Sequence, residues 1–196
     1  QSATLSALSD KIKTLDMVDM VVVGRFVGTE GLSAVSIGGE VLQLLTFVAM
    51  GFSNAGQILL SRYVGEERHD RIGNMVGTLF TLLLGLAVIL TVLMIAAYRP
   101  ILNWLNTPDD IYLYTQQYSL ICVLGIVFIY GYNLVSAILR GIGDSKHPFM
   151  FIAIASVVNI ILDLIFVGPF KMGPAGAALA TIIGQIIVAL VFVVYA

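Results

Sequence analysis

Long apolar stretches separated by short polar segments are the main pattern along this chain. A helix needs about 20 mostly apolar residues to cross the hydrocarbon core of a bilayer. Five stretches reach that length, and polar, glycine or proline residues mark their ends. The pattern therefore predicts membrane-spanning helices over about 32–60, 72–97, 112–139, 148–167 and 174–196.

A sixth helix is predicted over about 5–27, and its two halves differ in character. The second half is apolar. The first half carries four charged side chains, at Asp10, Lys11, Lys13 and Asp16. A helix that began only at Leu15 would be about 20 Å long, too short to cross the hydrocarbon core. We therefore expect one helix whose first turns lie in water or against protein.

The composition supports a membrane protein. Of the 196 residues, 59% are hydrophobic and 11% are charged, and the mean hydropathy is +0.98. Soluble domains carry about 25% charged residues, so a soluble core does not explain this chain. No long linker or low-complexity segment interrupts the sequence. We predict an all-α polytopic membrane protein in which residues 1–196 form a single six-helix transmembrane bundle.

The sequence also argues against several classes of function. The net charge of −2, with no basic stripe, argues against a nucleic-acid partner. The one cysteine, Cys122, rules out an internal disulfide framework and cysteine-rich metal sites. No serine–histidine–aspartate constellation has its histidine at membrane depth, and no glycine-rich phosphate loop follows a strand. We therefore expect a non-enzymatic protein without a cofactor, surrounded by membrane lipid.

Lysine and arginine differ in density between the two sides that the helices define. One side holds Lys11, Lys13, Arg62, Arg68, Arg71, Arg140 and Lys146. The other side holds Arg25, Arg99 and Lys171. The positive-inside rule therefore predicts a multi-pass protein of the inner (plasma) membrane with its N-terminus in the cytoplasm. Because the last helix stops at Ala196 without a charged flank, we expect the chain to be part of a longer protein.

Two acidic residues fall inside apolar stretches. Asp163 follows Asn159 by four residues, so the carboxylate and the amide share one face of a helix. Asp19 lies within the apolar run 17–23. An ionisable group near the centre of a bilayer costs several kcal/mol and is rarely present without a function. The two acids therefore indicate a site for a cation or a proton.

Structural roles are the alternatives for these residues. Asn159 and Asp163 could form a polar pair between helices, but such pairs gain only about 0.6–2 kcal/mol, and a carboxylate is an expensive way to obtain that. Asp19 could pair with Lys13 or Arg25, but both lie six positions away and out of phase on a helix. We favour the functional interpretation for both acids.

Other polar residues in the predicted spans are candidates for a substrate path. Amide and phenol groups in apolar helices either line such a path or bond between helices, and the sequence leaves both interpretations open. The candidates are Gln43, Gln57, Gln117, Tyr132 and Asn133.

Four motifs occur in order along the chain. The first is Val-Asp-Met-Val-Val-Val-Gly-Arg-Phe-Val-Gly at 18–28, and the second is Ala-Gly-Gln-Ile-Leu-Leu-Ser-Arg-Tyr-Val-Gly at 55–65. The third is Ser-Ala-Ile-Leu-Arg-Gly-Ile-Gly-Asp-Ser-Lys at 136–146. The fourth joins Asn-Ile-Ile-Leu-Asp at 159–163 to Gly-Pro-Ala-Gly-Ala-Ala-Leu-Ala-Thr at 173–181. Together they make the chain resemble the first of the two six-helix bundles in the multidrug and toxic compound extrusion (MATE) family.

The resemblance implies an antiporter that exports organic cations and other amphiphilic drugs, driven by inward Na⁺ or H⁺. Family members have twelve helices, so this chain would be the ion-binding N-terminal half. A C-terminal bundle, or a second copy in a parallel homodimer, would complete it.

The resemblance also implies a coupling-ion site at Asp19, Asn159, Asp163, Ala177 and Thr181. If Na⁺ is the coupling ion, Asp19, Asn159, Asp163 and Thr181 would bind it, because hard cations prefer oxygen ligands. For Thr181, a hydrogen bond to a carbonyl of its own helix is an equal alternative.

One departure from the family pattern and two other functions qualify this picture. The family commonly has asparagine three residues before the acid of the first helix, where this chain has Asp16. A flippase for a lipid-linked precursor is one alternative, but it needs a strongly cationic cavity, and only Arg25 and Arg140 come close to one. A non-transporting membrane bundle is another, but it has no need of Asp19 and Asp163.

Overall fold

The computed structural model describes residues 20–195, and it describes them as helices joined by short turns. A short helical segment covers 20–27. The longer helices are α2 (Thr29–Gly65), α3 (His69–Trp104), α4 (Asp109–Gly141), α5 (Lys146–Val167) and α6 (Pro174–Tyr195). All five are long and apolar enough to cross a membrane. The all-α membrane-bundle prediction is confirmed, while most of the predicted first helix lies outside the described residues.

Helices α2 to α5 are longer than the apolar stretches that predicted them. The α2 helix has 37 residues and α3 has 36. At 1.5 Å per residue each is about 55 Å long, well beyond the hydrocarbon thickness of about 30 Å. Backbone hydrogen bonding continues into polar sequence, whereas hydropathy marks only the part that lipid surrounds. The apolar pattern therefore located the spans and underestimated the helices.

A single glycine separates the segment 20–27 from α2. Gly28 has φ 84°, a left-handed conformation that suits glycine because it has no Cβ. Its amide donates to the Gly24 carbonyl at 3.1 Å, and its carbonyl accepts from the Leu32 amide at 3.2 Å. Hydrogen bonding thus runs through the turn. The chain reverses in one residue where the sequence predicted a loop of about four.

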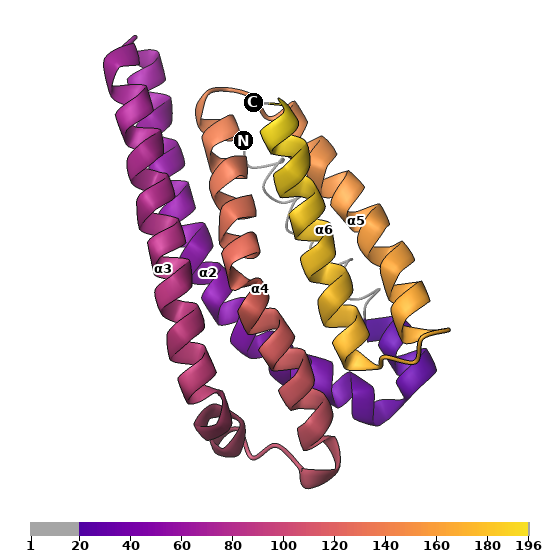
Figure 1. Cartoon of the computed structure of the whole chain (residues 1–196). Helices are drawn as coiled ribbons and strands as arrows, with labels where there is room; N and C mark the ends of the chain where they lie inside the picture. The colour runs from indigo at the N-terminus through magenta and orange to yellow at the C-terminus, as the bar shows by residue number, and fades with distance from the viewer. Residues whose placement is uncertain (1–19, 196) are drawn as a thin grey trace.

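The α4 helix is the centre of the bundle. It packs against α2, α3 and α6, while α5 packs mainly against α6. Figure 1 shows α2 crossing behind α4, and the N-terminal part of α2 reaching below α5 and α6. Hairpin connections place the turns 65–69 and 141–146 at one end of the bundle and the turns 104–109 and 167–174 at the other.

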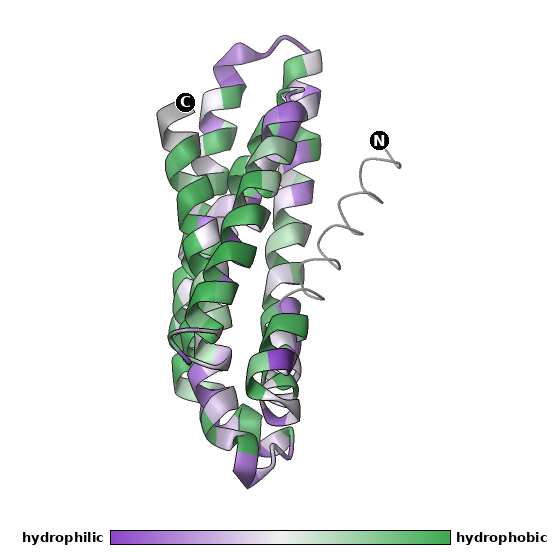
Figure 2. Cartoon of the chain, turned by 90° about the vertical axis from the view of Figure 1, so that its right-hand side faces the viewer, coloured by the Kyte–Doolittle hydropathy of each residue, from purple (hydrophilic) through white to green (hydrophobic). Residues whose placement is uncertain are grey.

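The outer surface of the bundle is apolar. Large side chains such as Phe52 on α2, Val92 on α3 and Ile161 on α5 are well exposed, at 47%, 62% and 50%. Figure 2 shows hydrophobic residues along the helices and hydrophilic residues gathered at their ends. Lipid is the solvent that makes such a surface favourable. The chain is a multi-pass membrane protein.

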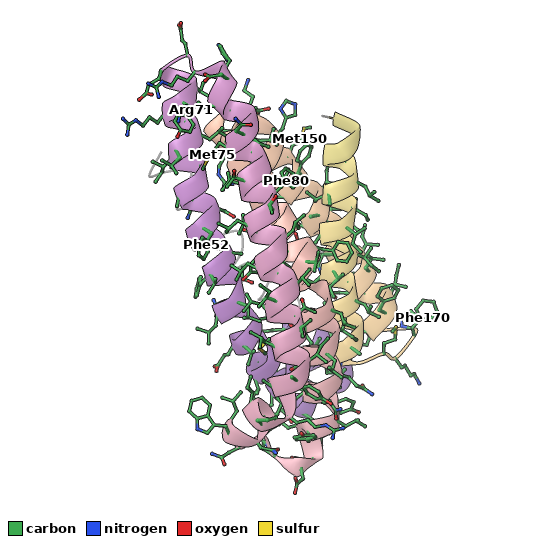
Figure 3. The ribbon with its side chains drawn as sticks, turned by 60° about the vertical axis from the view of Figure 1, so that its left-hand side comes forward. Phe52, Arg71, Met75, Phe80, Met150 and Phe170 are labelled. Atoms are coloured by element: carbon green, nitrogen blue, oxygen red, sulfur yellow. The ribbon has the colours of Figure 1, made fainter. Side chains whose placement is uncertain are left out.

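The described basic residues keep the predicted division between the two ends. Arg71 lies at one end of the bundle, and Phe170, in the turn before α6, lies at the other (Figure 3). The first end also holds Arg62, Arg68, Arg140 and Lys146. The second end holds Arg25, Arg99 and Lys171. Which end faces the cytoplasm stays a prediction.

One phenol fixes α4 against α2. Tyr130 is fully buried in the core cluster that includes Ala49, Leu83 and Leu134. Its hydroxyl donates to the carbonyl oxygen of Leu45 at 2.8 Å. A buried hydroxyl needs such a partner, because water does not reach it. This bond joins positions 85 residues apart, and no pattern in the sequence predicts which residue the phenol contacts.

Replacing Tyr130 by phenylalanine should lower the free energy of unfolding by about 0.5–1.5 kcal/mol, because one buried interhelical hydrogen bond is lost at nearly constant volume. Chemical unfolding in detergent micelles measures the difference. Tyr63→Phe, in the last turn of α2, serves as the control and should leave stability unchanged. Equal effects of the two substitutions would contradict the role given to Tyr130.

The turn between α4 and α5 is held by a carboxylate. Asp144 Oδ1 accepts hydrogen bonds from the Lys146 and His147 amides, both at 3.2 Å, and so caps the start of α5. Its Oδ2 lies 2.5 Å from His147 Nδ1. Partial burial acts to raise the pKa of Asp144, but the hydrogen bonds from His147 and Lys146 outweigh it and leave the pKa below its ordinary value.

Acid should therefore weaken this turn. A lowered pKa in the folded state means that the carboxylate stabilises the fold above its ordinary pKa of about 3.9, and that this stabilisation is lost as the pH falls through the folded-state value. Unfolding measured between about pH 7 and pH 3 should show a smaller loss of stability for Asp144→Asn than for the parent. Ser145→Ala should keep the parent profile, because Ser145 makes no side-chain capping bond.

Candidate functional site

The inner face of α5 carries the polar residues singled out from the sequence. Asn159, Asp163 and Val167 recur every four residues and are buried, at 7%, 0% and 2% exposure. The opposite face presents Val157, Ile161 and other large apolar side chains to the outside. The sequence thus makes α5 a helix with one apolar outer face and a narrow polar stripe that faces protein.

Small residues on α6 bring its backbone close to α5. Ala177, Ala178 and Ala180 are buried at 1% exposure or less. A Cβ on Gly184 would lie 3.3 Å from the Ala155 carbonyl oxygen of α5. Close approach of this kind is how membrane helices associate without a hydrophobic driving force between them. It brings the polar stripe of α5 within reach of side chains on α6.

A hydrogen bond joins the two helices at the predicted site. The Asn159 amide Nδ2 donates to Thr181 Oγ1 at 3.3 Å, and the Thr181 hydroxyl donates to the Ala177 carbonyl oxygen at 3.1 Å. The intrahelical bond considered for Thr181 is therefore present, and it coexists with the contact to α5. Three of the five predicted site residues form one connected chain of polar atoms.

Asp163 lies one turn along α5 from Asn159 and is fully buried. Four residues further on, Val167 packs in a cluster with Val22, Val35 and Ala177, which brings α5 against the segment 20–27, α2 and α6. The carboxylate therefore stands where several elements meet. Asp19, the other predicted acid, lies outside the described residues.

A cavity of about 220 Å³ opens beside this polar stripe. It lies between α2 and α4 on one side and α5 and α6 on the other, and both Asn159 and Thr181 line it. Its apolar lining residues include Leu42, Ile129 and Ile152. The other polar lining residues are Thr46, Ser53, Asn54, Tyr132, Asn133, Ser136, Arg140, Ser156 and Gln185.

The predicted substrate-path residues divide into two groups. Tyr132 and Asn133 line the cavity. Gln57 does not, and its Oε1 accepts a hydrogen bond from Arg140 Nε at 2.9 Å. Gln43 and Gln117 are exposed on the outer surface of the described bundle, away from this cavity. The cavity therefore collects two of the five, and their role in a substrate path stays a prediction.

Sequence reasoning missed Ser53, Arg140 and Gln185 as cavity residues. Gln185 follows Thr181 by four residues, so the spacing that linked Ala177 to Thr181 would have found it if continued one turn. The sequence places Arg140 at a helix end and offers it, with Arg25, as a residue close to a cationic cavity, but it does not predict that Arg140 lines the cavity found here. Serines carry no such signal, because in membrane helices they also serve as small packing residues.

The atoms at the α5–α6 contact suit a hard monovalent cation or a proton. They are a carboxylate, an amide, a hydroxyl and a backbone carbonyl, all with oxygen atoms that such a cation prefers. Within residues 20–195 no cluster of three or more histidine, cysteine or acidic side chains suits a transition metal. The buried carboxylate is the group whose charge a bound cation would compensate.

Membrane-spanning helices around a cavity, with a buried acid one helical turn from a residue that lines it, are the arrangement expected of a membrane transport bundle. The MatE family model matches residues 12–165. The chain therefore belongs to the MatE family of transporters, as the four motifs predicted.

Relatives and solved structures agree. The probable multidrug resistance protein YpnP of Bacillus subtilis (strain 168) is 33% identical over 173 residues, covering 88% of this chain and 39% of that protein. YoeA of the same organism, also named a probable multidrug resistance protein, is 32% identical over 91% of this chain and 40% of its own length. The chain thus spans about 40% of these relatives.

The fold is that of solved transporters of the same class. A multidrug resistance MATE family transporter of the MOP superfamily, solved in an inward-facing conformation, superposes with a TM-score of 0.85 at 26% identity, over 93% of this chain and 41% of that chain. A MATE crystal structure in a bent conformation gives a TM-score of 0.86 at 25% identity, over 92% and 40%.

Replacing Gly184 by valine should separate α5 from α6 and lower the free energy of unfolding by about 1–3 kcal/mol, because the added carbons meet the backbone at Ala155. Gly85→Val on α3 is the matched control, since no heavy atom lies within 4 Å of its Cβ position. Unfolding in micelles compares the two. A loss of stability no greater at Gly184 than at Gly85 would contradict the close-packed contact.

Proposed function

We propose that this chain supplies the ion-coupling bundle of an antiporter that exports organic cations and other amphiphilic drugs, driven by the inward flow of Na⁺ or H⁺. The observation that carries it is Asp163, which is fully buried within the membrane-spanning helix α5, one turn from an amide that contacts α6. The free-energy cost of burying a carboxylate there exceeds the stabilisation that a polar contact between helices provides. A role in binding a cation or a proton accounts for its presence.

The packing of the segment 20–27 supports Asp19 as the second acid. Val22 and Val167 belong to the same buried cluster. Asp19 precedes Val22 by three residues, and Asp163 precedes Val167 by four. Each acid is thus about one helical turn in sequence from a residue of this cluster. We propose that both acids, with Asn159 and Thr181, provide oxygen ligands for the coupling ion, and that Ala177 offers its carbonyl.

The mechanism follows from the cost of buried charge. With both carboxylates ionised, their repulsion and desolvation favour an arrangement of helices that admits water or a cation. Binding of Na⁺ or protons removes that cost and favours a closed arrangement of α5 and α6. If the ion and the substrate prefer different arrangements, each changes the binding free energy of the other. The two changes are equal in size. This reciprocity is the coupling that antiport requires.

Alternating access needs a second body against which this bundle moves. The chain matches about 40% of its relatives. We propose that either a further bundle of the whole protein or a second copy, in a parallel homodimer, completes the transporter. The protein would lie in the inner membrane with the arginine-rich end, which includes Arg62, Arg68 and Arg71, in the cytoplasm.

Asp163→Asn should abolish the stabilisation of the purified chain by its coupling ion. For the parent, Na⁺ should raise the melting temperature relative to K⁺ if sodium couples, and lowering the pH should do so if protons couple. A ligand at 100 times its dissociation constant stabilises by about 2.7 kcal/mol, so the shift should be measurable. In the whole protein, the same substitution should abolish ion-driven drug export from vesicles.

The matched control is Asp110→Asn, an exposed acid in the first turn of α4. It should leave both the ion response and the export unchanged. An Asp163→Asn variant that melts with the parent's full response to Na⁺ and to pH, or exports at the parent's rate, would overturn the proposed coupling site.

A further inference from the structure

The cavity is charged at one end only. Arg140 is the single charged side chain among its lining residues in the described part of the chain, and Asp163 is not part of the lining. We infer that the end of the cavity beside Arg140 is an anion site, which takes the phosphate or carboxylate group of an amphiphile whose apolar part lies against the cavity wall. This inference does not depend on ion coupling at Asp163.

Arg140 is held in place without being neutralised. It lies in the last turn of α4, and its Nε donates to Gln57 Oε1 of α2 at 2.9 Å. No carboxylate of the described residues pairs with it. The nearest acid in sequence, Asp144, is engaged instead by His147. A fixed guanidinium with its terminal nitrogens uncommitted is suited to the two-pronged recognition of carboxylate or phosphate oxygens.

Two hydroxyl groups line the same cavity, each one helical turn along its own helix from a member of the Arg140–Gln57 pair. Ser136 precedes Arg140 by four residues on α4 and is 3% exposed. Ser53 precedes Gln57 by four residues on α2, is 1% exposed, and its Oγ has no hydrogen-bond partner. Both serines line the cavity. A buried hydroxyl without a partner is destabilising, and an anion bound by Arg140 would accept a hydrogen bond from it.

The rest of the cavity suits an apolar group. Leu42, Met50, Ile129 and Ile152 form much of its wall. The volume of about 220 Å³ is below the range for a whole drug-sized ligand, and it accommodates one ring system or part of a chain. Arg140 lies in the last turn of α4, at the end of the cavity-lining part of that helix, so an amphiphile can place its anionic group there and its apolar part deeper in the bundle.

A structural role for Arg140 is the competing explanation, because the bond to Gln57 also ties α4 to α2. The two roles differ in what they predict. A purely structural tie affects stability and the binding of every ligand alike. An anion site affects the affinity for negatively charged ligands and leaves positively charged ligands of the same shape unaffected, or lets them bind more tightly.

The test uses two fluorescent probes with the same ring and opposite charge, 2-naphthylacetate and 2-naphthylethylammonium. Their binding to the purified chain in nonionic detergent is measured by fluorescence titration against protein-free micelles. Arg140→Gln should lower the binding affinity for the anionic probe by about tenfold or more, as expected for the loss of a charge-assisted pair of hydrogen bonds. The affinity for the cationic probe should stay within about twofold or rise.

Three further variants keep the inference falsifiable if Arg140→Gln does not fold. Arg140→Lys keeps the charge and should retain part of the anion affinity. Ser53→Ala should lower the affinity for the anionic probe by about threefold and leave the affinity for the cationic probe unchanged. Arg71→Gln, an exposed arginine at the same end of the bundle, is the control and should change neither. Equal loss for both probes, or anion affinity unchanged in both Arg140 variants and in Ser53→Ala, would overturn the anion site.

Competition identifies the source of the anion. Phosphatidylglycerol that displaces 2-naphthylacetate, where phosphatidylcholine does not, would support the site and identify a lipid headgroup as its occupant. Inorganic phosphate that displaces the probe would support the site and identify a soluble anion. Displacement by neither would overturn the inference.

Discussion

Burying the carboxylate of Asp163 among apolar helices costs several kcal/mol. The helix contacts around it keep this carboxylate away from lipid. The small residues of α6 allow α5 to approach, which brings Asn159 to Thr181 and surrounds the carboxylate with protein. The segment 20–27 closes the same region from a third side, by its packing against Val167. The folded chain would be far less stable if Asp163 faced lipid. The acid can therefore occupy this position only because these helix contacts surround it.

The cavity joins two polar regions of different character. One, at Asn159 and Thr181, offers oxygen atoms beside a buried carboxylate. The other, at Arg140, offers positively charged nitrogen and hydroxyl groups. On helix geometry alone, the 13 positions that separate Asn159 from Lys146 along α5 place the first region about 20 Å from the start of that helix. A ligand in this cavity therefore meets a positive charge at one end and neutral oxygen atoms at the other.

Much of this could be predicted from the sequence, for identifiable reasons. Hydropathy located five spans because lipid imposes one clear requirement on residues it touches, and the spacing of Asn159 and Asp163 placed both on one buried face. What could not be predicted depends on three-dimensional packing: the one-residue turn at Gly28, the bond from Tyr130 to α2, and the inward position of Arg140. Gln43 and Gln57 look alike in sequence, yet one is exposed and the other bonds to Arg140.

The way α5 is attached to the bundle has a mechanical consequence. Among the five long helices α5 packs extensively on α6 and only slightly on α4, and Val167 adds a contact to the segment 20–27. If the pair α5–α6 tilts as one leaf, the bond between Asn159 and Thr181 stays intact inside it, while the contacts of α6 with α4 and of Val167 with the segment 20–27 rearrange. Because this leaf forms one wall of the cavity and α2 with α4 forms the other, such a tilt would change the space for a ligand while the ion ligands on α5 and α6 keep their mutual geometry.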